Sequence, residues 1–294
     1  MSARDRDPFQ PEHLNQPLRD QGAWAAWLRD LEIPVLADTA ATLEAMRANE
    51  DAVDANLIGE LISADPLMTL KVLVHASANR PARVVTATET VTGALVMMGI
   101  SPFFNAFGAQ PTVEALLHER PAALGGLREL LLRARRAAHF ALAFAVHRMD
   151  HHAASIHQAA LQHDFAERLL WCHAPVLALR MQELQQVDPA LRSNTVQRAV
   201  FNAELPALQH ALMIGWRLPE LLVRIADDDA DAHPRSGTAV DPHSVQCVML
   251  AVRLARHTRR GWHDAALPDD LRDIGELLNL SPPATLALLH DIDR

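Results

Sequence analysis

Residues 57–74 read LIGELISADPLMTLKVLV and predict two helices that meet at the pair Asp65-Pro66. Apolar residues recur at helical spacing before this pair, at Leu57, Ile58, Leu61 and Ile62. Asp65 is a favourable N-cap, because its carboxylate can accept hydrogen bonds from the free N–H groups of a first turn, and proline suits the first helical position. The second helix should bury one face, formed by Leu67, Leu70 and Val74.

Helix signals continue on the C-terminal side of this stretch. Thr86 and Glu89 have the spacing of a capping box, and Gly99 suits the left-handed position that ends the helix after them. Two long helices are expected next, one over residues 126–149 and one from residue 151 or 152 to residue 170. Near the C-terminus, Ser281-Pro282 should open a helix that points Leu286 and Leu289 inward. Alternating β-branched runs are lacking, so we predict an all-α multi-helix bundle.

The polarity of the chain suggests its division into parts. Residues 1–20 are polar and predict a mobile N-terminal tail, followed by an amphipathic segment with Trp24, Trp27 and Leu28 that should dock on the body. The main domain is expected over residues 21–226, with an N-terminal helical part at 21–120 and a second helical part at 121–226. Residues 227–243 are predicted to form a polar loop. The C-terminal helices, at 244–294, should complete the second bundle through Val245, Val248, Met249 and Val252.

Composition excludes several classes of protein. Apolar residues make up 49% of the 294-residue chain, as in globular proteins, and 36 acidic against 27 basic residues give a net charge of −9, which argues against nucleic-acid binding. We interpret the group Arg133, Arg135 and Arg136 as a solvated helix face. Cys172 and Cys247 have no CxxC partner and are expected to be small buried apolar residues. The chain has neither a signal-peptide core nor an apolar run of membrane-spanning length, so we expect a cytoplasmic protein without a membrane partner.

Four pieces of the sequence, in the expected order, resemble the HDOD family, the "HD-related output domain" of bacterial signalling proteins. They include an Asp-Pro junction, a capped helix that ends in glycine, and a His-containing helix, with His210, that ends in Trp-x-Leu-Pro. The pieces are LEIPVLADTAATLEAMR (31–47), LIGELISADPLMTLKVLVHASANRP (57–81), VTATETVTGALVMMGI (85–100) and LPALQHALMIGWRLPELLVRIA (205–226). The resemblance implies an all-α fold of the HD-domain/HDOD type and a role in bacterial signal transduction.

The resemblance also implies where a metal site would lie. Enzymes of the parent HD superfamily use a His, a His-Asp pair and a distant Asp to bind a divalent ion for phosphate-ester hydrolysis. On this chain the first His corresponds to His139 and the pair to His163-Asp164, whereas the last Asp falls at Val252, which cannot ligate a metal. Active members continue the pair with Ile-Gly where this chain has Phe-Ala, and the His-His-Glu motif of cyclic-dinucleotide phosphodiesterases is absent at residues 227–229.

Two interpretations of these residues follow. His139 and His163 share helix faces with apolar residues, so both are expected to point into the bundle, either hydrogen-bonded to a carboxylate such as Asp164 or as remnants of a metal site. We predict a vestigial pocket, open to a ligand, at His139, His163, Asp164 and His210, with no catalytic residue, metal or cofactor. It should lie in the cleft between the N-terminal helices and the HD-like bundle.

The predicted function is that of a non-enzymatic HDOD-type module that binds a signalling protein or a small ligand, while the sequence leaves the oligomeric state open. The first alternative is a divergent HD-type metal-dependent phosphohydrolase acting on nucleotides or cyclic dinucleotides. A second alternative, a nucleic-acid-associated regulator, is disfavoured by the acidic charge.

Overall fold

The structure is a computed structural model that describes residues 13–79, 90–188, 191–225 and 241–294. Within these ranges all regular structure is helical, apart from an isolated parallel bridge between Val35 and Thr112. The predicted all-α fold is therefore confirmed. The proposed capping box of Thr86 and Glu89 lies outside the described residues, and Thr90 caps the next helix by accepting from the Gly93 N–H.

The N-terminal helices are short, because caps, prolines and glycines interrupt the chain often. They are α1 (Gln21–Arg29), α2 (Ala37–Arg47), the 3-10 helix η1 (Glu50–Ala52), α3 (Ala55–Ser63), α4 (Pro66–Ala78), α5 (Val91–Met98), α6 (Ile100–Ala106) and α7 (Val113–Leu116).

The central helices are built around one long element, the 27-residue helix α8. They are α8 (Pro121–His147), α9 (Ala153–Gln162), α10 (Phe165–His173), α11 (Pro175–Val187), α12 (Ser193–Phe201), α13 (Leu205–Trp216) and α14 (Glu220–Ile225). The C-terminal helices are α15 (Pro242–His257), the 3-10 helix η2 (Thr258–Arg260), α16 (Leu267–Leu278) and α17 (Pro282–Ile292). Among the described residues, every helix is too short or too polar to span a bilayer.

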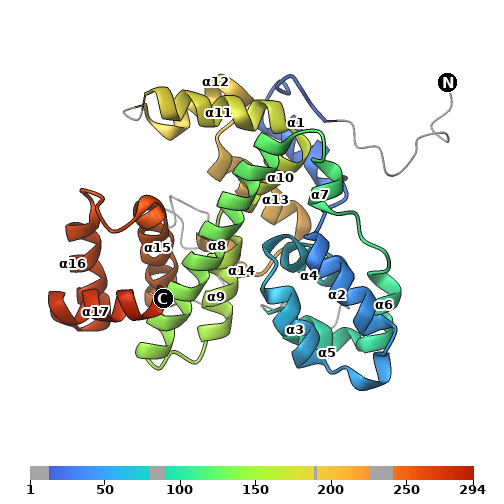
Figure 1. The fold of residues 1–294 in the computed structure, drawn as a ribbon, viewed down its shortest axis with the longest axis horizontal. Helices are drawn as coiled ribbons and strands as arrows, with labels where there is room; N and C mark the ends of the chain where they lie inside the picture. Colours follow the sequence, from blue (N-terminus) through green and yellow to red (C-terminus); the bar gives the residue numbers. More distant parts are fainter. Residues whose placement is uncertain (1–12, 80–89, 189–190, 226–240) are drawn as a thin grey trace.

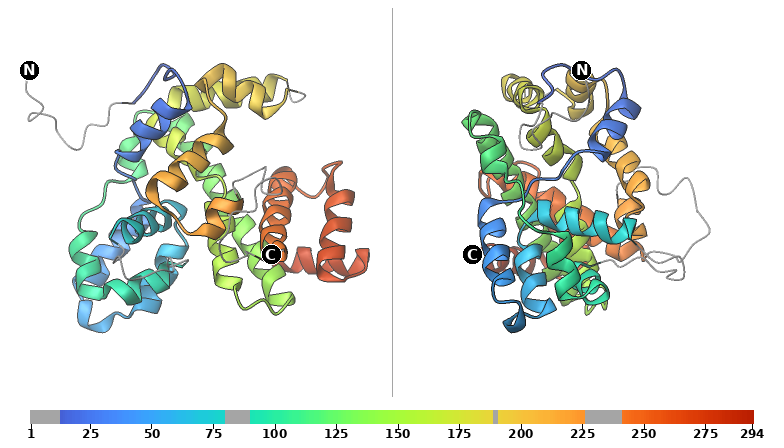
Figure 2. Two further views of the ribbon diagram at one scale, coloured as in Figure 1. Left: turned by 180° about the vertical axis from the view of Figure 1, so that it is seen from behind. Right: turned by 90° about the vertical axis from the view of Figure 1, so that its right-hand side faces the viewer.

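Helix α8 forms the centre of the molecule, with α9 and α15 packed along it. Figures 1 and 2 show helices α2–α6 on one side of the α8–α9 pair and α15–α17 on the other, with α1, α11 and α12 at one end. The central bundle thus separates the C-terminal helices α15–α17 from the lobe formed by α2–α6.

Two hydrophobic cores meet at α4. The main core runs through α8–α15, whereas a second, smaller core lies among α2–α6. Helix α4 belongs to both, since Leu67 and Leu70 face the main core while Met68 and Val72 face the smaller one, and all four are fully buried. The sequence pattern predicted only the face of α4 that carries Leu67 and Leu70.

The junction at Asp65-Pro66 forms as predicted. The Asp65 carboxylate accepts hydrogen bonds from the Leu67 N–H at 2.9 Å and the Met68 N–H at 3.2 Å, and Pro66 takes the first helical position. Its other oxygen accepts from the Leu36 N–H at 2.9 Å, so the same side chain also fixes the start of α2. Gly99 ends α5 with a positive φ of +85°, but its ψ of 157° lies outside the left-handed helical region that was predicted.

Several predicted boundaries and faces were wrong. Helix α8 begins at Pro121, before the expected residue 126, because proline suits a first helical position. The single helix expected over residues 151–170 is two helices, α9 and α10. Leu286 and Met249, predicted to face inward, are 37% and 40% exposed, while Leu289 is buried as predicted.

The segment before α1 lies against the central bundle where the structure describes it. The Leu14 N–H donates to the His173 carbonyl at 2.9 Å, and the Asn202 side chain donates to the Leu18 carbonyl at 3.0 Å. Trp24 is fully buried and donates from its indole to the Phe201 carbonyl at 2.7 Å, so α1 docks on the body as expected. The mobility of residues 1–20 stays a prediction.

Candidate functional site

The pair His163-Asp164 forms the break between α9 and α10, and both side chains are largely buried. Helix α9 ends at Gln162 and α10 begins at Phe165. Arg168 of α10 is fully buried and donates to the Leu161 carbonyl at 2.8 Å, which satisfies one of the free carbonyls at the end of α9. Burial lowers the pKa of Arg168 to about 10, so the side chain keeps its charge. The break is thus held by a cation placed at a helix C-terminus.

A glutamine from α13 holds the same break from the other side. The Gln209 side-chain amide donates to the His163 carbonyl, and its oxygen accepts from the Ala166 N–H at 3.3 Å. Gln209 is 5% exposed, and a buried amide of this kind is retained only where its donors and acceptors are paired. The two residues at the break are therefore fixed in position by neighbours on α10 and α13.

The Asp164 carboxylate is the centre of a charged cluster. It contacts His163 Nδ1 at 2.9 Å, Arg133 Nη2 of α8 at 3.0 Å and Arg256 Nη2 of α15 at 2.8 Å. Arg133 also donates to Glu167 at 3.3 Å. The side chains of Asp164 and Arg133 are 18% and 19% exposed, so their ion pair is largely shielded from solvent, whereas the Arg256 side chain is 48% exposed.

These neighbours keep Asp164 ionised. Burial alone raises the pKa of the carboxyl group, but Arg256, His163 and Arg133 lower it more, and the pKa lies well below its ordinary value. The two guanidinium groups therefore supply the positive charge that compensates a carboxylate in a poorly solvated position.

The residues present do not fit an HD-type divalent ion. Val252 is 4% exposed in the apolar core, and Arg256, one helical turn further along α15, is the residue that reaches Asp164. An ion at Asp164 would have to displace two arginines and would find no carboxylate at position 252. Among the described residues, no group of three or more His, Cys, Asp or Glu side chains is placed to hold one metal ion.

His139 does not join the pair, and its predicted inward orientation was wrong. It is exposed on α8, and Val146, two turns further along the same face, is 61% exposed. The buried face of this helix carries Ala141, Phe140 and Phe144 instead. His139 lies near His157 of α9, whose pKa is lowered by burial and by His139.

His210 also lies outside the hydrogen bonds around Asp164. It follows Gln209 on α13, and adjacent residues of a helix point about 100° apart, so Gln209 rather than His210 faces the break. The Nε2 atom of His210 is buried without a hydrogen-bond partner in the described part of the chain. Of the four predicted site residues, the structure brings together only His163 and Asp164.

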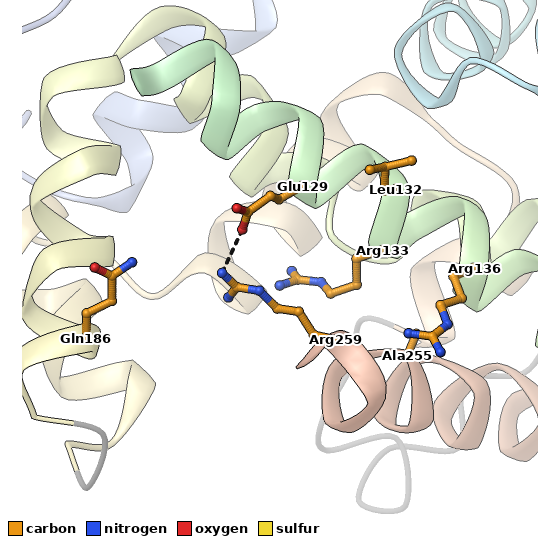
Figure 3. A pocket seen from close by; sticks show the side chains of 7 residues that line it. All are labelled: Glu129, Leu132, Arg133, Arg136, Gln186, Ala255 and Arg259. Carbon is orange, nitrogen blue, oxygen red and sulfur yellow. Dashed lines mark hydrogen bonds and ion pairs between the residues drawn. The ribbon is translucent and has the colours of Figure 1, made fainter. Parts of the chain in front are cut away.

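A cavity of about 490 Å³ lies beside this cluster, and Arg133 belongs to both. Figure 3 shows its walls, which come from α8, α11 and the segment from α15 to η2. The lining residues are Glu129, Leu132, Arg133, Arg136, Gln186, Ala255 and Arg259. The predicted solvated face was therefore wrong for Arg133 and Arg136, which are 19% and 25% exposed and make ion pairs inside the fold.

Sequence reasoning missed Arg133, Arg256 and Gln209 as site residues. One signal was available for Arg256, because it lies four residues after Val252 and so shares its helix face. No spacing rule connects Arg133 or Gln209 to the pair, since they reach it from helices far away in the chain.

Comparisons with known proteins agree with this fold. The chain matches the HDOD domain family over residues 33–232. Its structure is similar to that of the MmoQ response regulator from Methylococcus capsulatus str. Bath, with a TM-score of 0.62, 16% identity, and coverage of 89% of this chain and 99% of that one. A virulence factor from Campylobacter jejuni subsp. jejuni is similar at a TM-score of 0.62 and 15% identity, covering 92% of this chain and 98% of that one.

No curated protein sequence matches the chain. At such identities the structural likeness shows the fold, while the family assignment rests on the sequence match, which spans more than half of the 294 residues. The all-helical architecture and the match over residues 33–232 lead to the same conclusion: the chain belongs to the HDOD domain family.

Proposed function

We propose that the protein is a non-enzymatic regulatory module of bacterial signal transduction that acts by binding a protein or a small ligand. One observation carries this proposal, the pairing of the Asp164 carboxylate with Arg133 and Arg256. The similar fold of a protein named as a response regulator supports the signalling setting.

The physical argument concerns competition for one carboxylate. Metal-assisted hydrolysis needs an ion that polarises the phosphoryl group and activates water. Here that ion would displace two charge-assisted hydrogen bonds, so that Arg256 would lose its carboxylate partner and Arg133, only 19% exposed, would keep Glu167 alone. Removing one partner of a shielded ion pair is costly, so the carboxylate serves the fold.

A divergent phosphohydrolase is the second candidate, and one feature favours it. His163 and Asp164 remain adjacent at a helix break, with Nδ1 and Oδ1 2.9 Å apart. The enzyme would require the arginines to move away and a further ligand to be supplied by substrate or water.

The test is metal content and phosphoester hydrolysis of protein purified without chelators. We expect less than stoichiometric iron, manganese or zinc, no change of metal content in His163→Ala, and no product release from nucleotide substrates. His139→Ala is the matched control, because that histidine is exposed and lies outside the cluster. Stoichiometric metal lost only in His163→Ala, together with turnover, would establish the enzyme instead.

A further inference from the structure

The cavity beside Asp164 has the size and the walls of a ligand site. Its volume of about 490 Å³ falls within the range of pockets that hold small molecules, roughly 300 to 1,000 Å³. Its walls come from three separate elements, with Gln186 near the end of α11 facing Arg133 and Arg259 across the space in Figure 3. An occupant would therefore contact α8, α11 and the end of α15 together.

The charged residues that line the cavity are mostly arginines, and each of these arginines already pairs with a carboxylate of the fold. Three of its seven lining residues are arginines and one is a glutamate, while the whole chain has a net charge of −9. Arginine presents five N–H donors in a planar fork, which matches the oxygens of carboxylates and phosphoryl groups. The lining can therefore hold an anion that takes the place of one of these carboxylates.

The three arginines differ in the donors they have left. All three nitrogens of Arg136 are engaged, since Nε and Nη2 pair with Asp293 and Nη1 donates to the Thr258 carbonyl at 2.7 Å. Arg133 makes both of its ion pairs through Nη2, and Arg259 likewise uses only Nη2. Within the described residues, Nε and Nη1 of Arg133 and Arg259 make no hydrogen bond, so they can serve a ligand.

Arg133 and Arg259 are also held differently. Arg133 is fixed by two carboxylates and is 19% exposed, so it is preorganised. Arg259 pairs with Glu129 at 2.6 Å, but the two side chains are 41% and 58% exposed, and an ion pair so open to water contributes little stability. Glu129 is thus an exchangeable partner that a stronger anion can replace.

We infer that this cavity binds a phosphorylated small molecule of nucleotide size, with its phosphoryl oxygens between Arg133 and Arg259. A phosphoryl group carries up to two charges and three acceptor oxygens, against one charge on the Glu129 carboxylate, so it competes for Arg259. Leu132, 62% exposed, and Ala255 supply apolar contact for the rest of the molecule, and the Gln186 amide can bind its polar groups. This inference rests on the small-ligand form of the proposed function.

The experiment is calorimetric titration of the full chain with inorganic pyrophosphate and with ADP at low salt. We expect one site per chain, tighter binding of ADP than of pyrophosphate, and weaker binding as salt is raised. Arg259→Ala should weaken ADP binding about tenfold, whereas Glu129→Gln should strengthen it severalfold, because it removes the competing carboxylate.

Two further variants separate the site from a general charge effect. Arg272→Ala removes the same charge from the exposed surface of α16 and should leave binding unchanged. Leu132→Glu adds a negative charge on an exposed side chain of the cavity wall and should abolish binding without disturbing the core. Folding of each variant is checked by circular dichroism.

Each contrary result would overturn one part of the inference: the site, the size class of the ligand or the non-enzymatic function on which it rests. Absence of ADP binding to both wild type and Glu129→Gln, or equal weakening by Arg259→Ala and Arg272→Ala, overturns the site. ADP binding no tighter than that of pyrophosphate overturns the nucleotide-sized class. Release of phosphate from ADP contradicts the non-enzymatic function and leaves the site intact, so the two failures are distinguishable.

Discussion

At the scale of single residues, Asp164 should matter for stability. Asp164→Asn keeps the shape of the side chain, but it takes the carboxylate partner from Arg256 and leaves Arg133 paired with Glu167 alone. We expect the free energy of unfolding, measured with urea at neutral pH, to fall by roughly 3 kcal/mol. Asp269→Asn is the control, because Asp269 is 68% exposed and pairs with Arg272, which is 60% exposed, so the substitution should change the stability little. A loss no larger than that of the control contradicts a structural role for Asp164.

The same comparison has a pH dependence. The pKa of Asp164 is lower in the folded protein than the ordinary value of 3.8, so its stabilising effect is present above that value and is lost as the pH falls below it. The difference in unfolding free energy between wild type and Asp164→Asn should therefore narrow in acid. Just below pH 3.8 the unfolded chain binds a proton at this carboxyl group, and at still lower pH the folded protein binds it too and loses the ion pairs.

The side chains also show which inferences a sequence supports. Asp65 was predicted correctly because a cap depends on a few adjacent residues. His139 was placed wrongly because the sequence around it, AAHFALAFAV, is apolar on nearly every side, so spacing alone does not select the buried face. The bulky rings of Phe140 and Phe144 decide it, since both are fully buried.

At the scale of elements, two adjacent glycines in α8 should respond oppositely to alanine. A Cβ on Gly126 would lie 2.3 Å from the buried ring of Trp171, whereas a Cβ on Gly125 would meet no atom within 4 Å. Alanine in a helix is favoured over glycine by about 1 kcal/mol. We expect Gly125→Ala to raise the thermal unfolding midpoint and Gly126→Ala to lower it, because overpacking costs roughly 1 to 3 kcal/mol. Equal shifts would show that Trp171 moves aside freely.

The α9–α10 break was not predictable from local pattern. Neither proline nor glycine lies between Gln162 and Phe165, and the apolar residues on both sides continue at helical spacing. The break depends on Arg168 and Gln209, which bind its carbonyl groups from the next helix and from α13. Long-range contacts of this kind have no signature in a single sequence.

At the scale of the whole molecule, the two cores should unfold together. All five tryptophans of the chain lie in or against the main core, so their fluorescence reports that core alone, whereas circular dichroism reports every helix. Met68 is fully buried in the smaller core, and truncating such a side chain costs roughly 2 to 5 kcal/mol. Because α4 is buried in both cores, Met68→Ala should lower the fluorescence and dichroism midpoints by the same amount.

Leu132→Ala, at an exposed position, is the control and should shift neither signal. Separate transitions in Met68→Ala would show instead that the α2–α6 lobe folds independently of the bundle.

The fold class was predicted from the sequence, whereas the cavity was not. Helix signals and the family resemblance predicted the fold class, because hydrophobic spacing reports each helix separately. The cavity could not be foreseen, since its walls come from Glu129, Gln186 and Arg259, which only packing brings together.

The pairing of Asp164 with two arginines has a consequence for genome surveys. A histidine followed by aspartate is commonly read as the mark of a hydrolase, yet here the acid neutralises cations from two distant helices. A search that also scores basic residues at the positions of Arg133 and Arg256 would sort chains by whether that acid is free for chemistry.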